Sequence, residues 1–240
     1  MNNSVQIIPL ANLALAFLPA LFVVVIAFRW SLGHGNMLYA ISRMLVQLML
    51  IGYLLAYIFD SNSSFVVMSV LAVMIFASSW IALRTVKNRR KSLYSKAFYA
   101  IALGGGATLI IVIWGVLALD PWYLPSYVIP LAGMIFANAL NSVSLAADRL
   151  AAEIDRVDDY TIARNIAFRS SMIPITNSLF AVGLVSLPGM MTGQILSGVS
   201  PLIAARYQIM VMCMVFGSAG ISSACFLHWV KPDFEKTSAE

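Results

Sequence analysis

Long apolar windows, separated by short polar stretches, follow one another along the chain. They lie near residues 7–28, 37–59, 65–86, 96–119, 127–147, 171–187 and 205–230. All except the sixth are about as long as the roughly 20 residues that a helix needs to cross the hydrocarbon core of a bilayer. The pattern predicts an all-α integral membrane protein of about seven transmembrane helices. We expect one polytopic membrane domain over residues 1–240, with a cytoplasmic connection near 148–169 and a short tail at 231–240.

The sixth window belongs to a stretch that is apolar and yet unsuited to a plain helix. Between Arg169 and Arg206 there is no Lys, Arg, Asp, Glu or His, but there are three prolines and four glycines. Both residue types disfavour a helix interior, and Pro174 at the start of the window is typical of a discontinuous helix. Broken backbone at membrane depth is tolerated where it lines a wet cavity. We therefore expect one Gly/Pro-broken segment here, in which Gly189 and Gly193 allow a conformation or a close approach that β-branched residues cannot share.

Composition and charge place the chain in a membrane and give it a direction. Hydrophobic residues make up 61% of the sequence and charged residues 10%, so most of the chain cannot face water. Fourteen of the fifteen Lys and Arg residues fall on alternate loops, which the positive-inside rule assigns to the cytoplasm. The N-terminus is therefore predicted outside and the C-terminus inside. The net charge of +5 reflects this topology and contact with anionic lipid, and it does not imply nucleic-acid binding.

A polar stripe runs along the fifth window. At 100° per residue its members fall within a sector of roughly 120° on one helix face. The stripe consists of Asn138, Asn141, Ser144 and Asp148. It is predicted to face other helices or a cavity. Two interpretations stay open for Asn138, Asn141 and Ser144: hydrogen bonding between helices, or the lining of a substrate path.

The broken segment adds uncharged polar groups and thioethers to the candidate path. These are Asn177, Ser178, Met190, Met191, Thr192 and Gln194. Thioethers suit soft ions such as Cu(I) and match hard ferric iron poorly, although methionine also fills irregular gaps in a core. His, Cys and carboxylate residues do not cluster at ligand spacing, so no metal ligand set is assigned and any iron is expected to bind weakly.

Signatures of enzymes are missing from the sequence. Gly104-Gly105-Gly106 is followed by Ala-Thr, without the lysine that a phosphate-binding loop requires. No His-Glu-x-x-His helix and no intramembrane pair of Asp residues occurs. The chain is expected to hold no cofactor, and if ATP drives transport, another chain must hydrolyse it.

Three runs resemble the bacterial FetB-type iron-export permeases and the plant aluminium-sensitive permeases. They are PWYLPSYVIPLAGM at 121–134, NALNSVSLAADRL at 138–150 and the long run from Pro174, which contains VSLPGMMTGQIL at 185–196. The resemblance implies a permease of an ABC transporter in the bacterial inner membrane, paired with a separate ATP-binding subunit that holds ATP-Mg, and acting as a homodimer. It implies iron export in bacteria and, for plant members, a link to aluminium tolerance and UDP-glucose.

The sequence departs from this family in the connection after Asp148-Arg149-Leu150. The family has a longer loop there with a Leu-Gly-Ala-Thr turn, whereas this chain reaches Arg169 without a glycine. The remaining residues have apolar positions at helical spacing, and two interpretations stay open: a short amphipathic helix that contacts the ATP-binding subunit, or only a solvated connection. The candidate coupling residues are Asp148, Arg149, Glu153, Ile154 and Arg169.

Two other functions fit the same sequence. One is a membrane scaffold or regulatory partner that keeps the permease fold without coupling to an ATPase. The other is a permease for a small metabolite such as a nucleotide sugar.

The charge pattern makes a direct prediction about topology. A reporter fused after Glu240 should read as cytoplasmic, because the basic residues mark that side of the membrane. A reporter with a periplasmic signal would overturn the arrangement with the N-terminus outside and seven spans.

Overall fold

A computed structural model describes residues 8–32, 34–61, 63–157 and 159–235, and these are almost entirely helical. No β-strand occurs in these ranges; the one exception to helix and loop is an isolated bridge between Val182 and Ser186. The chain divides into two compact units, one before and one after the connection at residues 61 and 62.

The first unit contains α1 (Leu10–Leu15), α2 (Phe17–Arg29) and α3 (His34–Asp60). Helices α2 and α3 pack against each other as a pair. In the most apolar window of each span, only 6% of the residues are buried. Because these exposed side chains are mostly apolar, the surface of this unit is suited to lipid or to another membrane chain.

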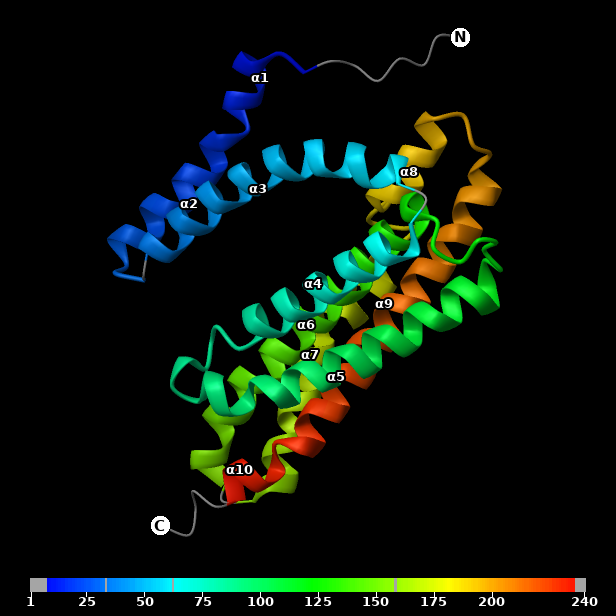
Figure 1. Cartoon of the computed structure of the whole chain (residues 1–240). Helices are drawn as coiled ribbons and strands as arrows, with labels where there is room; N and C mark the ends of the chain where they lie inside the picture. Colours follow the sequence, from blue (N-terminus) through cyan, green and yellow to red (C-terminus); the bar gives the residue numbers. More distant parts are fainter. Residues whose placement is uncertain (1–7, 33, 62, 158, 236–240) are drawn as a thin grey trace. The chain divides into compact units, whose positions relative to one another are not determined.

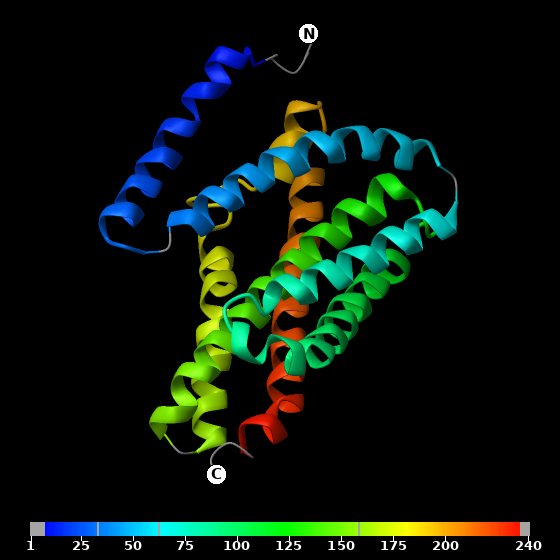
Figure 2. The ribbon, with the colours of Figure 1, turned by 60° about the vertical axis from the view of Figure 1, so that its left-hand side comes forward.

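The second unit is a helical bundle around α6 (Pro125–Val157), as Figures 1 and 2 show. Helices α4 (Ser64–Ala82), α5 (Arg90–Ile110), α7 (Tyr160–Ala181) and α9 (Pro201–Trp229) all pack against α6. The shorter elements are the 3-10 turn η1 (Lys87–Arg89), the π-helix η2 (Ile111–Val116), α8 (Gly189–Leu196) and α10 (Lys231–Glu235). The hydrophobic core of the unit is continuous across these helices.

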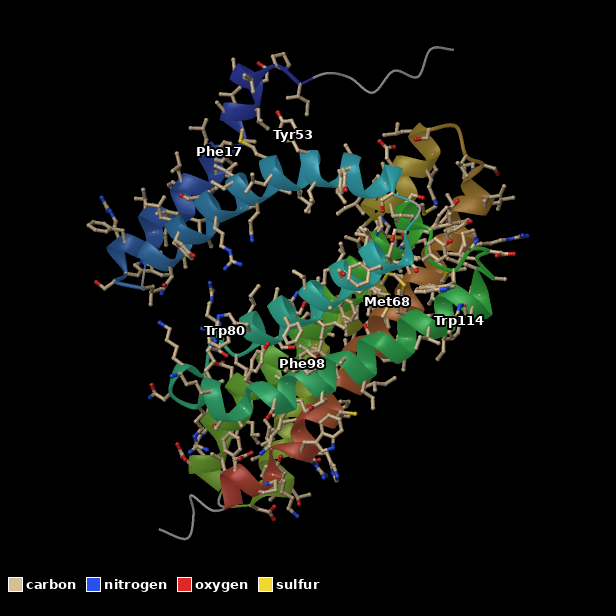
Figure 3. The ribbon with its side chains drawn as sticks, in the orientation of Figure 1. Phe17, Tyr53, Met68, Trp80, Phe98 and Trp114 are labelled. Atoms are coloured by element: carbon tan, nitrogen blue, oxygen red, sulfur yellow. The ribbon has the colours of Figure 1, made fainter. Side chains whose placement is uncertain are left out.

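Aromatic contacts hold α4 against α5 at the end of the bundle near α10. The rings of Phe76 and Phe98 lie 4.8 Å apart, and the guanidinium of Arg90 stacks over Trp80 at 3.6 Å. Figure 3 labels Trp80 and Phe98 at this end, with Met68 and Trp114 towards the opposite end. The two helices therefore meet at this end through aromatic rings and a stacked guanidinium.

Helices α6 and α7 form an antiparallel hairpin. The carboxylate of Asp159 caps α7 by accepting hydrogen bonds from the backbone N–H of Thr161 at 2.6 Å and of Ile162 at 3.3 Å. The hydroxyl of Tyr160 donates to the carbonyl of Leu227, which fixes the start of α7 to the end of α9. The predicted cytoplasmic connection at 148–169 is thus made by the end of α6 and the beginning of α7.

Within the described residues, six helices are long and apolar enough to cross a membrane. They are Leu10–Arg29, Gly35–Asp60, Ser64–Ala82, Lys87–Val116, Pro125–Val157 and Pro201–Trp229. A multi-pass membrane fold is therefore confirmed. The sixth predicted window lies in α7 and the turn after it, outside this set, so the count of seven and the orientation of the termini stay predictions.

The segment between Arg169 and Arg206 is broken, but at other positions than the sequence predicted. Helix α7 continues through Pro174 and ends at Ala181, so the expectation of a break at this proline is wrong. The left-handed conformations occur at Gly183 (φ 84°) and Gly198 (φ 90°). Gly189 and Gly193 lie within α8, and a Cβ at either would meet no atom within 4 Å. Their predicted special role is therefore wrong, because the chain turns just outside α8 and not within it.

Two adjacent glycines allow α5 to approach its neighbours closely. A Cβ at Gly104 would lie 2.7 Å from the backbone nitrogen of Ser222 in α9, and one at Gly105 would lie 2.7 Å from the ring of Phe136 in α6. Small residues at such crossings let membrane helices pack through their backbones. The glycine run that lacks a phosphate-binding lysine is thus a packing element.

A seam of buried serines joins α6, α7 and α9. The hydroxyls of Ser142 and Ser223 are hydrogen-bonded to each other, and Ser142 also donates to the carbonyl of Ser171 at 3.4 Å. The hydroxyl of Ser218 is shared between the carbonyl of Val215 in α9 at 3.1 Å and the carbonyl of Ile135 in α6 at 3.4 Å. Interhelical hydrogen bonds of this kind contribute about 0.6 kcal/mol each in membrane proteins. They fix the register of the three helices.

The close approach of α5 and α9 predicts unequal effects of two alanine substitutions. Gly104→Ala should lower the free energy of unfolding by about 1–3 kcal/mol, because the new methyl group meets backbone that cannot move aside. Gly106→Ala is the matched control, since a Cβ there meets no atom within 4 Å and alanine is the better helix former. Thermal unfolding in detergent measures both. Equal melting temperatures for the two variants would contradict the packing described here.

Candidate functional site

An uncharged cavity of about 310 Å³ lies between α6, α7, α9 and the turn that follows α7. Its polar lining comes from Asn138, Ser178, Ser186 and Gln208. The remaining lining residues are Met134, Ile175, Val182, Pro188, Val211, Met212 and Val215. None of these lining residues carries a charge, so the cavity offers oxygen and thioether groups in an apolar wall.

Gln208 is the most unusual residue of this cavity. Its side chain is 5% exposed, and its Oε1 has no hydrogen-bond partner. A buried polar atom without a partner costs about 1–3 kcal/mol, and native structures contain few of them. The orphaned oxygen is therefore a sign of a ligand or a role beyond packing.

Two other polar side chains of the cavity, Asn138 and Ser178, each use a donor within their own helix. The amide Nδ2 of Asn138 donates to the carbonyl of Met134 at 2.9 Å, and the hydroxyl of Ser178 donates to the carbonyl of Pro174 at 3.0 Å. What these side chains retain is acceptor capacity at their oxygens. The cavity lining thus combines oxygen acceptors with uncharged amide and hydroxyl donors.

The structure brings together two of the predicted path residues, Asn138 and Ser178, and separates the others from the cavity. Asn141 and Asn177 are exposed, Ser144 and Met191 are half-buried, and Met190 packs against the hydrophobic core. The hydroxyl of Thr192 donates to the carbonyl of Pro188 at 3.2 Å. The carbonyl oxygen of Gln194 is buried without a partner, but this residue does not line the cavity.

Sequence reasoning missed Met134, Gln208 and Met212. A signal for Gln208 existed, because it is an uncharged amide inside a strongly apolar window, where polar residues are functional candidates by default. Met134 and Met212 carry no comparable signal, since the chain contains thirteen methionines. Their position against Asn138 and Gln208 becomes visible only when α6 and α9 are packed.

A second recess, the charged groove, opens at the other end of α6. It has a volume of about 470 Å³ and lies between the α4–α5 connection, the end of α6 and α10. Its lining residues are Thr85, Val86, Lys87, Asn88, Arg89, Asp148, Ala151, Ala152, Ile154, Asp155 and Phe234. Bases and acids thus face the same groove from different elements.

Two of the predicted coupling residues, Asp148 and Ile154, line this groove. Glu153 is 4% exposed and forms ion pairs with Arg149 at 2.8 Å and with Arg156 at 3.2 Å, which stabilise the end of α6. Arg169 is exposed on α7 and does not line the groove. The groove wall is completed by Phe234, whose ring lies 4.5 Å below the guanidinium of Arg89.

The cavity and the groove share α6 as a common wall. Asn138 lines the first and Ala151 the second, and thirteen residues of helix correspond to a separation of about 20 Å. Lys87 and Arg89 line the groove, whereas no Lys or Arg lines the cavity. The two recesses therefore lie towards opposite ends of α6.

Metal-binding clusters of the usual kind were not found in the described ranges. No group of three or more His, Cys, Asp and Glu residues there is placed to hold a metal ion.

Comparison with known proteins places the sequence among membrane proteins. Residues 10–234 match the family described as "Uncharacterised protein family (UPF0014)". A UPF0014 membrane protein of Synechocystis is 36% identical over 196 residues, which cover 75% of this chain and 76% of that protein. The probable iron export permease protein FetB of Escherichia coli is 32% identical over 238 residues, covering 92% and 90%. No solved structure matches the chain.

A plant protein extends the comparison. Protein ALUMINUM SENSITIVE 3 of Arabidopsis thaliana is 30% identical over 238 residues, covering 92% of this chain and 85% of that protein. The resemblance noted from the sequence motifs is thereby confirmed over most of the chain. The Synechocystis relative is named a membrane protein and the Escherichia coli relative a permease, and no enzyme family is indicated. With its six candidate spans and a family match from residue 10 to residue 234, the chain belongs to the UPF0014 family of multi-pass membrane proteins.

Proposed function

We propose that this chain is the membrane-spanning subunit of an ABC transporter in the inner membrane, and that it exports a metal ion with ATP hydrolysed by a separate subunit. The observation that carries the proposal is the arrangement of the two recesses on α6. An uncharged cavity at one end suits a transported ion, and a charged groove at the other suits a protein partner. The permease name of the Escherichia coli relative supports the same function.

The charged groove is the proposed contact with the ATP-binding subunit. It lies at the end of the bundle that is rich in Lys and Arg, which the positive-inside rule assigns to the cytoplasm. Its mixed charges and the apolar side chains of Ile154 and Phe234 suit a helix or loop of a partner. A segment seated there would contact α6 directly.

The chemistry of the cavity favours a cation over a nucleotide sugar. A nucleotide sugar carries two negative charges, and its phosphates require N–H donors or basic residues. The cavity lining has no basic residue, and the amide of Asn138 already donates to Met134. Carbonyl and thioether groups instead coordinate cations.

We also propose that two copies of the chain associate in the membrane. The first unit exposes long apolar surfaces on α2 and α3, and such surfaces pack against lipid or against another membrane chain. A homodimer would cover part of them.

Blocking the charged groove should separate the ATP-binding subunit from this chain. Ala152→Arg places a long side chain in the groove from an exposed position, so the amount of ATP-binding subunit that copurifies should fall by about tenfold, as expected for loss of roughly 1.4 kcal/mol of binding. Thr161→Arg is the control for the effect of an added positive charge alone, because it places the same residue at an exposed site on α7 outside the groove.

Three outcomes are distinguishable in this experiment. Loss of the partner with Ala152→Arg alone supports docking in the groove. Loss with both variants, or with neither, contradicts docking there. If the unsubstituted chain isolates without any ATP-binding subunit, the chain is a membrane scaffold or regulator and the ABC assignment is wrong.

A further inference from the structure

We infer that the uncharged cavity is a binding site for a soft cation of low charge, such as Cu(I) or Ag(I), held by the thioethers of Met134 and Met212 and the carbonyl oxygen of Gln208. The inference deepens the proposed function, because it names the class of ion that the cavity accepts. It does not depend on the ATP-binding subunit.

The ligand atoms available in the cavity favour soft metal ions over hard ones. Met134 on α6 and Met212 on α9 line the cavity from two different helices, and thioethers are soft ligands that favour Cu(I). Asn138 and Ser178 add oxygen acceptors on the remaining sides. The hard carboxylate ligands that ferric or aluminium ions prefer do not occur among the lining residues.

The absence of charged residues from the cavity lining favours ions of low charge. Moving an ion from water into a medium of low dielectric constant is unfavourable, and the Born energy rises with the square of the charge. The lining residues supply no negative charge to offset this energy. A monovalent ion is therefore favoured strongly over a divalent or trivalent one.

The buried amide of Gln208 is an independent indication that a ligand binds. Its Oε1 is held in an apolar wall without a partner, at a position 5% exposed to solvent. Coordination to a cation would satisfy this oxygen, whereas packing alone leaves it unsatisfied. Gln208 also lies one helical turn before Met212 on α9, which places the two residues on the same face.

The test is a titration of the full-length chain in lipid nanodiscs with Ag(I) in chloride-free buffer. Cys213 and Cys225 are free thiols and would bind Ag(I), so the titration uses the Cys213→Ser/Cys225→Ser background. Met134→Leu/Met212→Leu should weaken Ag(I) binding by at least about tenfold, since both soft ligands are lost. Met210→Leu is the control, because Met210 packs against the core and does not line the cavity.

A substitution that should strengthen the binding of a divalent ion tests the selectivity for low ionic charge. Gln208→Glu keeps the size of the side chain and adds one negative charge, so it should strengthen binding of Co(II), used as an air-stable divalent probe, by about tenfold or more. Thermal unfolding of each variant confirms that the fold is retained.

Two kinds of result in these titrations would contradict the proposed binding site. Ag(I) binding that the Met134→Leu/Met212→Leu variant retains, or that Met210→Leu weakens equally, would show that the cavity is not the site. Tighter binding of Co(II) than of Ag(I) by the parent protein would reject the selectivity for low charge. Since this titration does not require the ATP-binding subunit, its failure is distinguishable from failure of copurification.

Discussion

The close approach of α5 to α9 at Gly104 and Ser222 is the contact on which the second unit depends. In a bilayer, burial against another helix gains little over burial in lipid, so association relies on tight packing and on hydrogen bonds between helices. Gly104 allows that packing against α9, Gly105 allows a close approach to α6, and the serine seam adds the hydrogen bonds. Larger side chains at these positions would separate the backbones.

This contact also determines where the cavity forms. Ser218, Ser222 and Gln208 belong to one helix, so the register of α9 at the seam sets the position of Gln208 relative to Asn138 on α6. A slip of one helical turn would move Gln208 by about 5.4 Å and remove its oxygen from the cavity. The polar chemistry at one end thus depends on small residues near the middle of the bundle.

Much of the fold, but little of the site, could be predicted from the sequence. Apolar windows identify membrane helices because the length of a helix is tied to the thickness of the bilayer, and six of them match helices that are long enough. The broken segment was also recognisable, although glycine content alone did not distinguish Gly183 and Gly198 from Gly189 and Gly193. Glycine in a helix and glycine in a turn look alike in a sequence.

The site was harder because it is made between helices. Periodicity places Asn138, Asn141 and Ser144 on one helix face, but it does not say which neighbour covers which part of that face. In the structure Asn138 and Gln208 line the same cavity, while Asn141 is exposed and Ser142 belongs to the serine seam. These assignments require the packing of α6 with α9, across a sequence separation that local patterns do not bridge.

The length of α6 has a mechanical consequence. A helix of 33 residues is about 50 Å long, which exceeds the roughly 30 Å thickness of the hydrocarbon core. If such a rod tilts by about 5° around its middle, its two ends move by about 2 Å in opposite directions. The serine seam lies between the two ends and can act as the pivot. A small displacement of α6 at the charged groove would then move its other end and widen the uncharged cavity.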